Sequence, residues 1–174
     1  MTITYKVKNG IYVNLTNRCP CACTFCLRQN GPGIYGSNPL WLEREPTERL
    51  ADLLEIAAYI KAKSPSTRIR VNTNGLADLI YNRSTAAEFV GKVDCVSISL
   101  NTDDPQEYLD VCRPKFGAAA YPALQKFAAD AAAAGLDVVM TVVDEPVTSK
   151  EKQARCQAIC DRLGVRLRIR PFEK

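Results

Sequence analysis

Short β-type runs alternate with helical stretches along most of the 174-residue chain. Turn and capping residues separate them: Asn74 and Gly75 close one run, while Gly135 and Gly164 stand where a helix would end. Strands that alternate with helices predict βα units and a parallel sheet. The expected strands are residues 11–15, 69–73, 95–100, 138–143 and 165–170, and the expected helices are residues 47–62, 84–90, 121–134 and 150–163.

The number of strands decides between a closed and an open architecture. A closed eight-stranded β/α barrel usually needs at least ~200 residues. We therefore expect an α/β fold, an open and partial parallel β/α barrel, built by residues 1–174 as one domain. Active groups in such folds lie in loops at the C-terminal ends of strands. The segment that follows residues 11–15 is thus where we expect the chemistry.

Composition removes several classes of function. The chain is 47% apolar and 24% charged, so it is not disordered, and its net charge of +4 is too mild to argue for nucleic acid. It has no histidine, which excludes histidine-based triads and mixed Cys/His zinc sites. We expect a cytoplasmic protein without a membrane partner, because no leader peptide or apolar run of ~20 residues is present. Eight cysteines in such a chain indicate metal or redox chemistry rather than disulfides.

Half of these cysteines lie within eight residues, at positions 19, 21, 23 and 26. Buried structural cysteines have no reason to be such close neighbours, whereas thiolates are the ligands of iron–sulfur clusters and zinc. Structural zinc usually takes two separated pairs of ligands. A second pair exists only if Cys156 and Cys160 supply it, so the pattern favours an iron–sulfur cluster and leaves a zinc-binding or thiol-binding module as the alternative.

Three of the four cysteines match a known signature. Cys19, Cys23 and Cys26 form C-x3-C-x2-C with Phe25 before the last cysteine, directly after an expected strand, and this resembles the radical SAM signature. The likeness extends over nearly the whole chain, to the radical SAM proteins encoded beside TatD-type nucleases. The segments that carry it are NLTNRC, CTFCLR, LWLEREPT, VNTNG, VSISLN, CRPKFG and the TVV strand end.

The resemblance implies a [4Fe–4S] cluster on Cys19, Cys23 and Cys26, in a loop spanning residues 17–31. The fourth iron would bind S-adenosyl-L-methionine, and an electron from a flavodoxin- or ferredoxin-like donor would cleave it to a deoxyadenosyl radical. The family implies Phe25 beside the adenine and a functional link to a TatD-type nuclease, with the substrate unassigned. Cys21 is an extra thiol, either a bystander or a competing ligand.

One part of the family pattern is missing. Radical SAM proteins carry a second strand that ends in a GEP-type motif, whose glutamate holds the amino group of S-adenosyl-L-methionine. Here the chain passes from LWLEREPT directly into a helix, so residues 43–48 mark an internal deletion of a helix and a strand. Glu45 is the residue left for that role, and residues 40–42 are a short run that would take the vacant place. The alternative is a cluster-binding homologue that has lost catalysis.

Polar residues near the ends of two strands are further candidates. Ser99 and Asn101 lie on one side of residues 95–100, where the resemblance implies contact with S-adenosyl-L-methionine and the alternative is a polar barrel interior. Asn72 is a weaker candidate, and Asn74 is expected to form a turn. Cys112 is expected to be a core or near-site thiol, and Cys156 and Cys160 to be packing residues. Arg166, Arg168 and Arg170 alternate with apolar residues, which predicts a half-buried strand first and a basic patch second.

Overall fold

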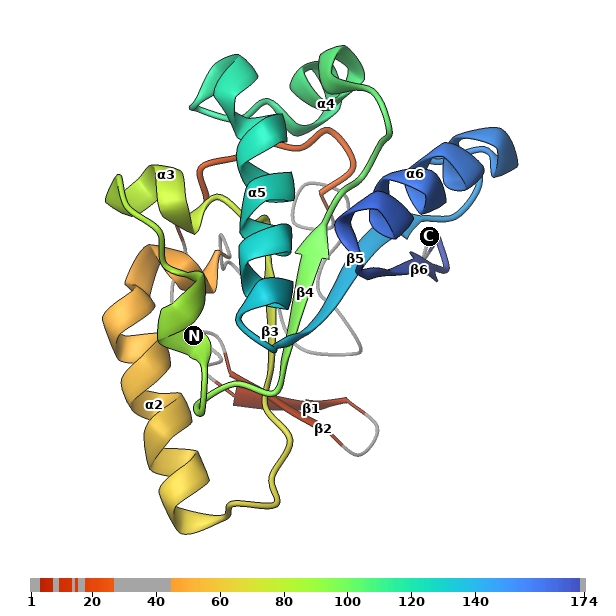
Figure 1. The fold of residues 1–174 in the computed structure, drawn as a ribbon. Coiled ribbons are helices and arrows are strands. Elements are labelled where there is room, and N and C mark those ends of the chain that lie inside the picture. Colours follow the sequence, from red (N-terminus) through yellow and green to blue (C-terminus); the bar gives the residue numbers. More distant parts are fainter. Residues whose placement is uncertain (1–3, 8–9, 14, 16–17, 27–44, 173–174) are drawn as a thin grey trace.

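The computed structural model describes residues 4–7, 10–13, 15, 18–26 and 45–172 (Figure 1). Its elements in chain order are β1 (Thr4–Val7), β2 (Gly10–Val13), the 3₁₀ helix η1 (Pro46–Arg49), α2 (Leu50–Lys63), β3 (Arg70–Thr73), α3 (Ala77–Tyr81), η2 (Ala86–Phe89), β4 (Cys95–Ser99), α4 (Pro105–Cys112), η3 (Gly117–Ala119), α5 (Ala120–Ala133), β5 (Asp137–Val143), α6 (Lys150–Leu163) and β6 (Arg166–Arg170).

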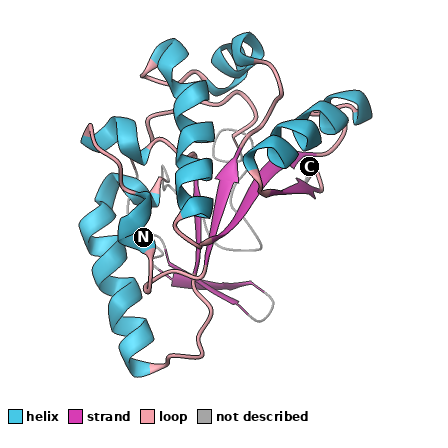
Figure 2. Cartoon of the chain, in the orientation of Figure 1, coloured by secondary structure: helices cyan, strands magenta, loops and turns pink. Residues whose placement is uncertain are grey.

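Four parallel strands form the main sheet, in the order β3-β4-β5-β6. Consecutive strands are neighbours, and each crossover contains helix, as the alternating pattern predicts. The helices α5 and α6 cover one face of the sheet (Figures 1 and 2). The sheet is open, so the predicted open α/β architecture is confirmed.

The expected first strand does not join this sheet. β2 pairs with β1 in an antiparallel hairpin, with Thr4 opposite Val13. Its side chains are exposed, Ile11 by 76%. The prediction of a fifth parallel strand at residues 11–15 was therefore wrong. The reason is the short link between the strands: two residues permit an antiparallel return, whereas a parallel partner needs a crossover of a dozen or more.

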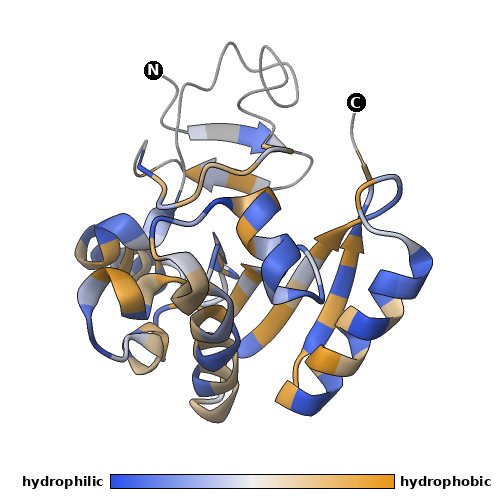
Figure 3. Cartoon of the chain, turned by 90° about the horizontal axis from the view of Figure 1, so that it is seen from above, coloured by the Kyte–Doolittle hydropathy of each residue, from blue (hydrophilic) through white to orange (hydrophobic). Residues whose placement is uncertain are grey.

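The hydrophobic core lies between the sheet and α5. Ile98 and Met140 are fully buried and face the helix, where Phe127 packs against Phe89 of η2 with ring centroids 5.9 Å apart. Figure 3 shows hydrophobic residues on the strands, interrupted by hydrophilic ones. Gly75 is required at the edge of this core, because its φ is +78° and a Cβ there would come within 2.9 Å of Ile98 Cγ2.

Most predicted helices are confirmed, with two differences. Residues 84–90 form only the single turn η2, and the two helices α3 and α4 were not predicted. The signal for α4 was present: Asp104 caps it by accepting a hydrogen bond from Glu107 N at 2.7 Å, and Pro105 occupies its first turn. Cys156 and Cys160 are fully buried in the core, as expected for packing residues. None of the helices in the described part of the chain has the length and apolar character to cross a membrane.

Candidate functional site

The cysteine segment, residues 18–26, lies beyond the C-terminal ends of β3 and β4 (Figure 1). It is held there by the end of α4 rather than by a preceding strand of the sheet. Thr24 N donates to Val111 O at 2.8 Å, Ala22 N donates to Cys112 O at 3.1 Å, and Cys21 forms an antiparallel bridge with Pro114. Backbone hydrogen bonds thus fix the segment at the edge where parallel β/α folds place their active groups.

The thiols of this segment lie close together. Cys19, Cys21, Cys23 and Cys26 are all free and partly exposed. Asn74, in the turn after β3, places its Nδ2 3.9 Å from Cys19 Sγ and 3.7 Å from Cys21 Sγ. Hydrogen bonding with the Cys19 thiol, then with the Cys23 thiol, followed by burial, raises the pKa of Cys21 well above its ordinary value.

A fifth thiol, Cys112, lies directly behind the segment. It is fully buried at the C-terminal end of α4, and Asn101 Nδ2 donates to its Sγ at 3.2 Å. Cys23 Sγ lies 3.7 Å from the Cys112 carbonyl oxygen. Hydrogen bonding with Cys23 and then burial raise the pKa of Cys112, so this thiol stays protonated. The expectation of a near-site core thiol is confirmed.

Glu45 connects the cysteine segment to the end of β3. Its N–H donates to Arg18 O at 2.9 Å, and its side chain is 1% exposed. Oε1 accepts from the backbone N of Thr47 at 3.2 Å and from the hydroxyls of Thr47 and Thr73, both at 2.6 Å. The other oxygen, Oε2, accepts one hydrogen bond within the described residues, from Asn74 N at 2.6 Å. Burial raises the pKa of Glu45 to about 7, against the opposing effect of its hydrogen bonds.

The hydrogen bonds of its own carboxylate and the turn that follows it position Glu45. Pro46 starts η1 at once, and the buried carboxylate accepts the hydrogen bonds that anchor it. A carboxylate oxygen has two lone pairs, so Oε1 is saturated, whereas Oε2 keeps one acceptor position. That position is what remains for a ligand.

The ends of β3 and β4 supply the other polar groups. Asn101 follows β4 with a left-handed φ of 67°, and its Oδ1 is buried without a hydrogen-bond partner in the described part of the chain. Ser99, at the end of β4, is partly buried. Asn72 lies within β3, is exposed and accepts a hydrogen bond from Arg70 Nε at 3.1 Å. The structure brings Asn74, rather than Asn72, to the cysteine sulfurs; its position directly after a parallel strand was the signal in the sequence.

Phe25 is partly buried and packs against the core beside the cysteines. Cys26 N donates to Cys23 O at 3.2 Å, which closes a turn between the last two cysteines of the motif. The rest of the predicted cluster loop, residues 27–31, and the short run at residues 40–42 lie outside the described residues. So does the part of the proposed deletion that precedes Glu45.

The cysteine segment supplies thiols, the donor type of iron–sulfur clusters. Within the described residues, no three Cys, Asp or Glu side chains are arranged to hold one metal ion. A four-iron cluster makes a different demand, because each thiolate binds its own iron and the sulfurs need not meet at one point. Cys19, Cys23 and Cys26 are soft, accessible donors in one loop. The buried Asn101 Oδ1 beside them is an orphaned acceptor of the kind that a ligand satisfies.

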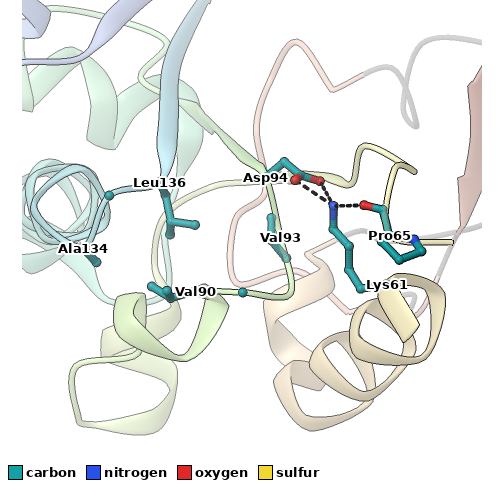
Figure 4. A pocket seen from close by; sticks show the side chains of 9 residues that line it. Lys61, Pro65, Val90, Val93, Asp94, Ala134 and Leu136 are labelled. Carbon is teal, nitrogen blue, oxygen red and sulfur yellow. Dashed lines mark hydrogen bonds and ion pairs between the residues drawn. The ribbon is translucent and has the colours of Figure 1, made fainter. Parts of the chain in front are cut away.

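A cavity of about 520 Å³ at the opposite edge of the sheet is a weaker candidate. Lys61 lies in it and bonds to the Asp94 carboxylate at 2.7 Å, to Thr67 O at 2.9 Å and to Pro65 O at 3.5 Å (Figure 4). An ammonium has three donors, and these contacts use them. The lysine thus ties α2 to the start of β4, and we assign the cavity no function.

Comparison with known proteins supports the fold. No family model matches the chain, and no curated protein matches it. Among solved structures it is similar to SuiB of Streptococcus suis bound to S-adenosylmethionine, with a TM-score of 0.56 and 14% sequence identity. The match covers 91% of this chain and 38% of SuiB, so the chain spans well under half of that protein. At this identity the likeness concerns the fold alone.

Proposed function

We propose that this protein holds a [4Fe–4S] cluster through Cys19, Cys23 and Cys26 and cleaves S-adenosyl-L-methionine reductively, as radical SAM enzymes do. The observation that carries the proposal is the position of the cysteine segment. It lies at the C-terminal edge of an open parallel sheet, between Asn74 and Cys112, in a fold similar to that of a protein crystallised with S-adenosylmethionine. The bound cluster would supply the electron that generates the deoxyadenosyl radical.

The chain's own residues would bind and orient the two groups. Asn74 Nδ2 would donate to the ligating sulfur of Cys19, which lowers the charge that the site must bury. Glu45 Oε2 would accept from the ligand's ammonium group with its remaining lone pair. Asn101, with its unsatisfied buried Oδ1, and Ser99 would contact the ribose or the carboxylate, and Phe25 the adenine.

A second candidate function follows from the same glutamate. Its carboxylate already accepts four hydrogen bonds from Thr47, Thr73 and Asn74. These hydrogen bonds occupy most of the acceptor positions of the carboxylate and give it a structural role. Such a role is expected in a protein that binds the cluster without cleaving S-adenosyl-L-methionine. In that case the chain would serve electron transfer or interaction.

The proposal extends to the protein's surroundings. It requires an external flavodoxin- or ferredoxin-like electron donor and includes a cytoplasmic location. It also includes a functional link to a TatD-type nuclease. The substrate is unassigned.

The test is anaerobic reconstitution with iron and sulfide, followed by assay of deoxyadenosine under a strong reductant. Wild-type protein should bind about four irons and release deoxyadenosine, and Cys26→Ala should do neither. Cys21→Ala is the matched control, because Cys21 is also partly exposed and lies in the same loop but outside the motif. A stable cluster without deoxyadenosine would support the second candidate. Zinc in place of iron and sulfide, or loss of iron in Cys21→Ala but not in Cys26→Ala, would refute the ligand assignment.

A further inference from the structure

A second cavity, of about 550 Å³, opens at the N-terminal ends of the strands, away from the cysteine segment. We call it the arginine cavity, because four arginines line it together with a single acidic residue. Cys95 and Val139 contribute to its apolar part. The charged residues that line it are Arg68, Arg70, Arg166, Arg168 and Asp137.

Strand register explains why these residues gather. Arg70 is paired with Cys95 and Cys95 with Asp137, while Val139 is paired with Arg166 and Thr141 with Arg168. Residues paired across parallel strands point to the same side of the sheet. The buried core residues Ile98 and Met140 occupy the alternate positions and face the helices. The arginines therefore share the face that α5 and α6 do not cover.

The positive charge in the cavity is only partly balanced. Asp137 pairs with both Arg68 at 2.6 Å and Arg166 at 2.5 Å, and these arginines hold its pKa below the ordinary value, so it is ionised. Among the described residues, Arg70 bonds to the neutral Ser97 hydroxyl at 2.7 Å and to Asn72 and to no carboxylate. Arg168 has no hydrogen-bond or ion-pair partner in the described part of the chain. Four guanidinium groups and one carboxylate leave an excess of three positive charges.

The cavity is built to bind an anion rather than to react with one. Its volume lies within the range of small-molecule sites, roughly 300–1,000 Å³, and exceeds what a single ion needs. The guanidinium groups reach solvent, since the Arg68 and Arg166 side chains are 70% and 67% exposed. Burial raises the pKa of the Cys95 thiol, so the one potential nucleophile stays protonated.

We propose that the arginine cavity binds a small phosphate compound carrying two or more phosphate groups, at a site separate from the cysteine segment. Guanidinium groups match phosphate oxygens in a bidentate geometry, and several of them on one concave surface favour a multiply charged ligand. Binding would relieve the repulsion among arginines that share one carboxylate. The proposal stands independently of the cluster, because the first residues of β3, β4 and β5 line the cavity, whereas the cysteine segment lies beyond the C-terminal ends of β3 and β4.

Titration calorimetry of the full chain with inorganic pyrophosphate tests this inference. A charge-assisted contact contributes enough that Arg168→Gln should weaken binding about 10-fold or more. Arg162→Gln is the matched control, because it removes the same charge from exposed α6, on the other side of the sheet, and it should leave the affinity within about 2-fold. Asp137→Asn should act in the opposite direction and tighten binding, since it releases two arginines.

The alternatives have distinct outcomes. Absence of pyrophosphate binding, or equal losses in Arg168→Gln and Arg162→Gln, would overturn the proposal. Citrate that binds as tightly as pyrophosphate would overturn the assignment to phosphate. A single-stranded oligonucleotide that binds more tightly than pyrophosphate, and is weakened equally by both arginine variants, would indicate a nucleic-acid surface instead. Thermal unfolding of each variant confirms that it is folded, and exposed Arg168 keeps the test decisive even if Asp137→Asn is unstable.

Discussion

Glu45 makes the stability of this protein depend on pH in an unusual direction. Its carboxyl group is fully buried, and burial raises its pKa from about 4.5 to about 7. In the unfolded chain the group releases its proton near pH 4.5, whereas the folded protein retains it up to about pH 7. Between these values the folded state binds more protons, so stability falls as pH rises. Most buried carboxylates in ion pairs behave in the opposite way.

The size of the effect follows from the pKa difference. Each pKa unit corresponds to about 1.4 kcal/mol, so ionised Glu45 weakens the folded state by about 3 kcal/mol above pH 7. Glu45→Gln resembles the protonated acid in shape and cannot ionise. Relative to this variant, the wild-type protein should lose about 3 kcal/mol of unfolding free energy between pH 4.5 and pH 8.

Urea unfolding of the reduced, cluster-free protein across this pH range measures the difference. Glu55→Gln, on the exposed side of α2, is the control, and its difference from wild type should not change with pH. If the difference in unfolding free energy between wild type and Glu45→Gln stays constant within about 0.5 kcal/mol across this pH range, the reasoning is refuted. It would mean that the hydrogen bonds from Thr47, Thr73 and Asn74 stabilise the charge enough to offset burial.

Three further predictions concern the scaffold and the thiols. Gly75→Ala should lower the free energy of unfolding by about 2–5 kcal/mol in denaturant, because the new Cβ would need a positive φ and would clash with Ile98. Gly164→Ala is the control: it has open space around it, so it should cost only the strain of the positive φ, about 1 kcal/mol. Equal losses in the two variants would contradict the clash. Asp104→Ala should lower stability by about 1 kcal/mol and loosen α4, seen as faster amide exchange there; unchanged exchange would show that the cap is dispensable. In the apo protein, iodoacetamide should modify the four buried cysteines only on unfolding, because burial raises the pKa of Cys156 to about 12 and of Cys160 to about 11; Cys21, whose raised pKa keeps it protonated, should also react slowly, and fast modification of a buried cysteine in mass spectra would contradict the packing.

Local signals in the sequence were sufficient for much of the architecture. The helices α5 and α6 end at Gly135 and Gly164, which adopt φ values of 87° and 68°, as C-terminal capping glycines should. The strands β3, β4, β5 and β6 lie within one residue of their predicted bounds, because each is bounded by a turn or a helix cap. The thiol cluster was also evident, since its donors are neighbours in the chain.

The residues with which a strand or a polar side chain pairs were not predictable in the same way. Residues 11–15 have strand propensity whether they pair with β1 or with a parallel neighbour, and the length of the link to β1 decided the outcome. The same holds for Asn72 and Asn74, which are equally polar and two residues apart. Only the turn after β3 brings Asn74 to the sulfurs and directs its N–H to Glu45.

Periodicity and capping are properties of contiguous residues, and they were enough to predict helices, strands, their parallel arrangement and a loop of neighbouring thiols. The environment of Glu45, the contact of Cys23 with Cys112 and the arginine cavity each bring together residues that are far apart in the chain, with separations from 28 to about 100 positions. Burial and electrostatics act through space, so the pKa of Glu45 and the excess charge of the arginine cavity exist only once β3, β4, β5 and β6 are in register.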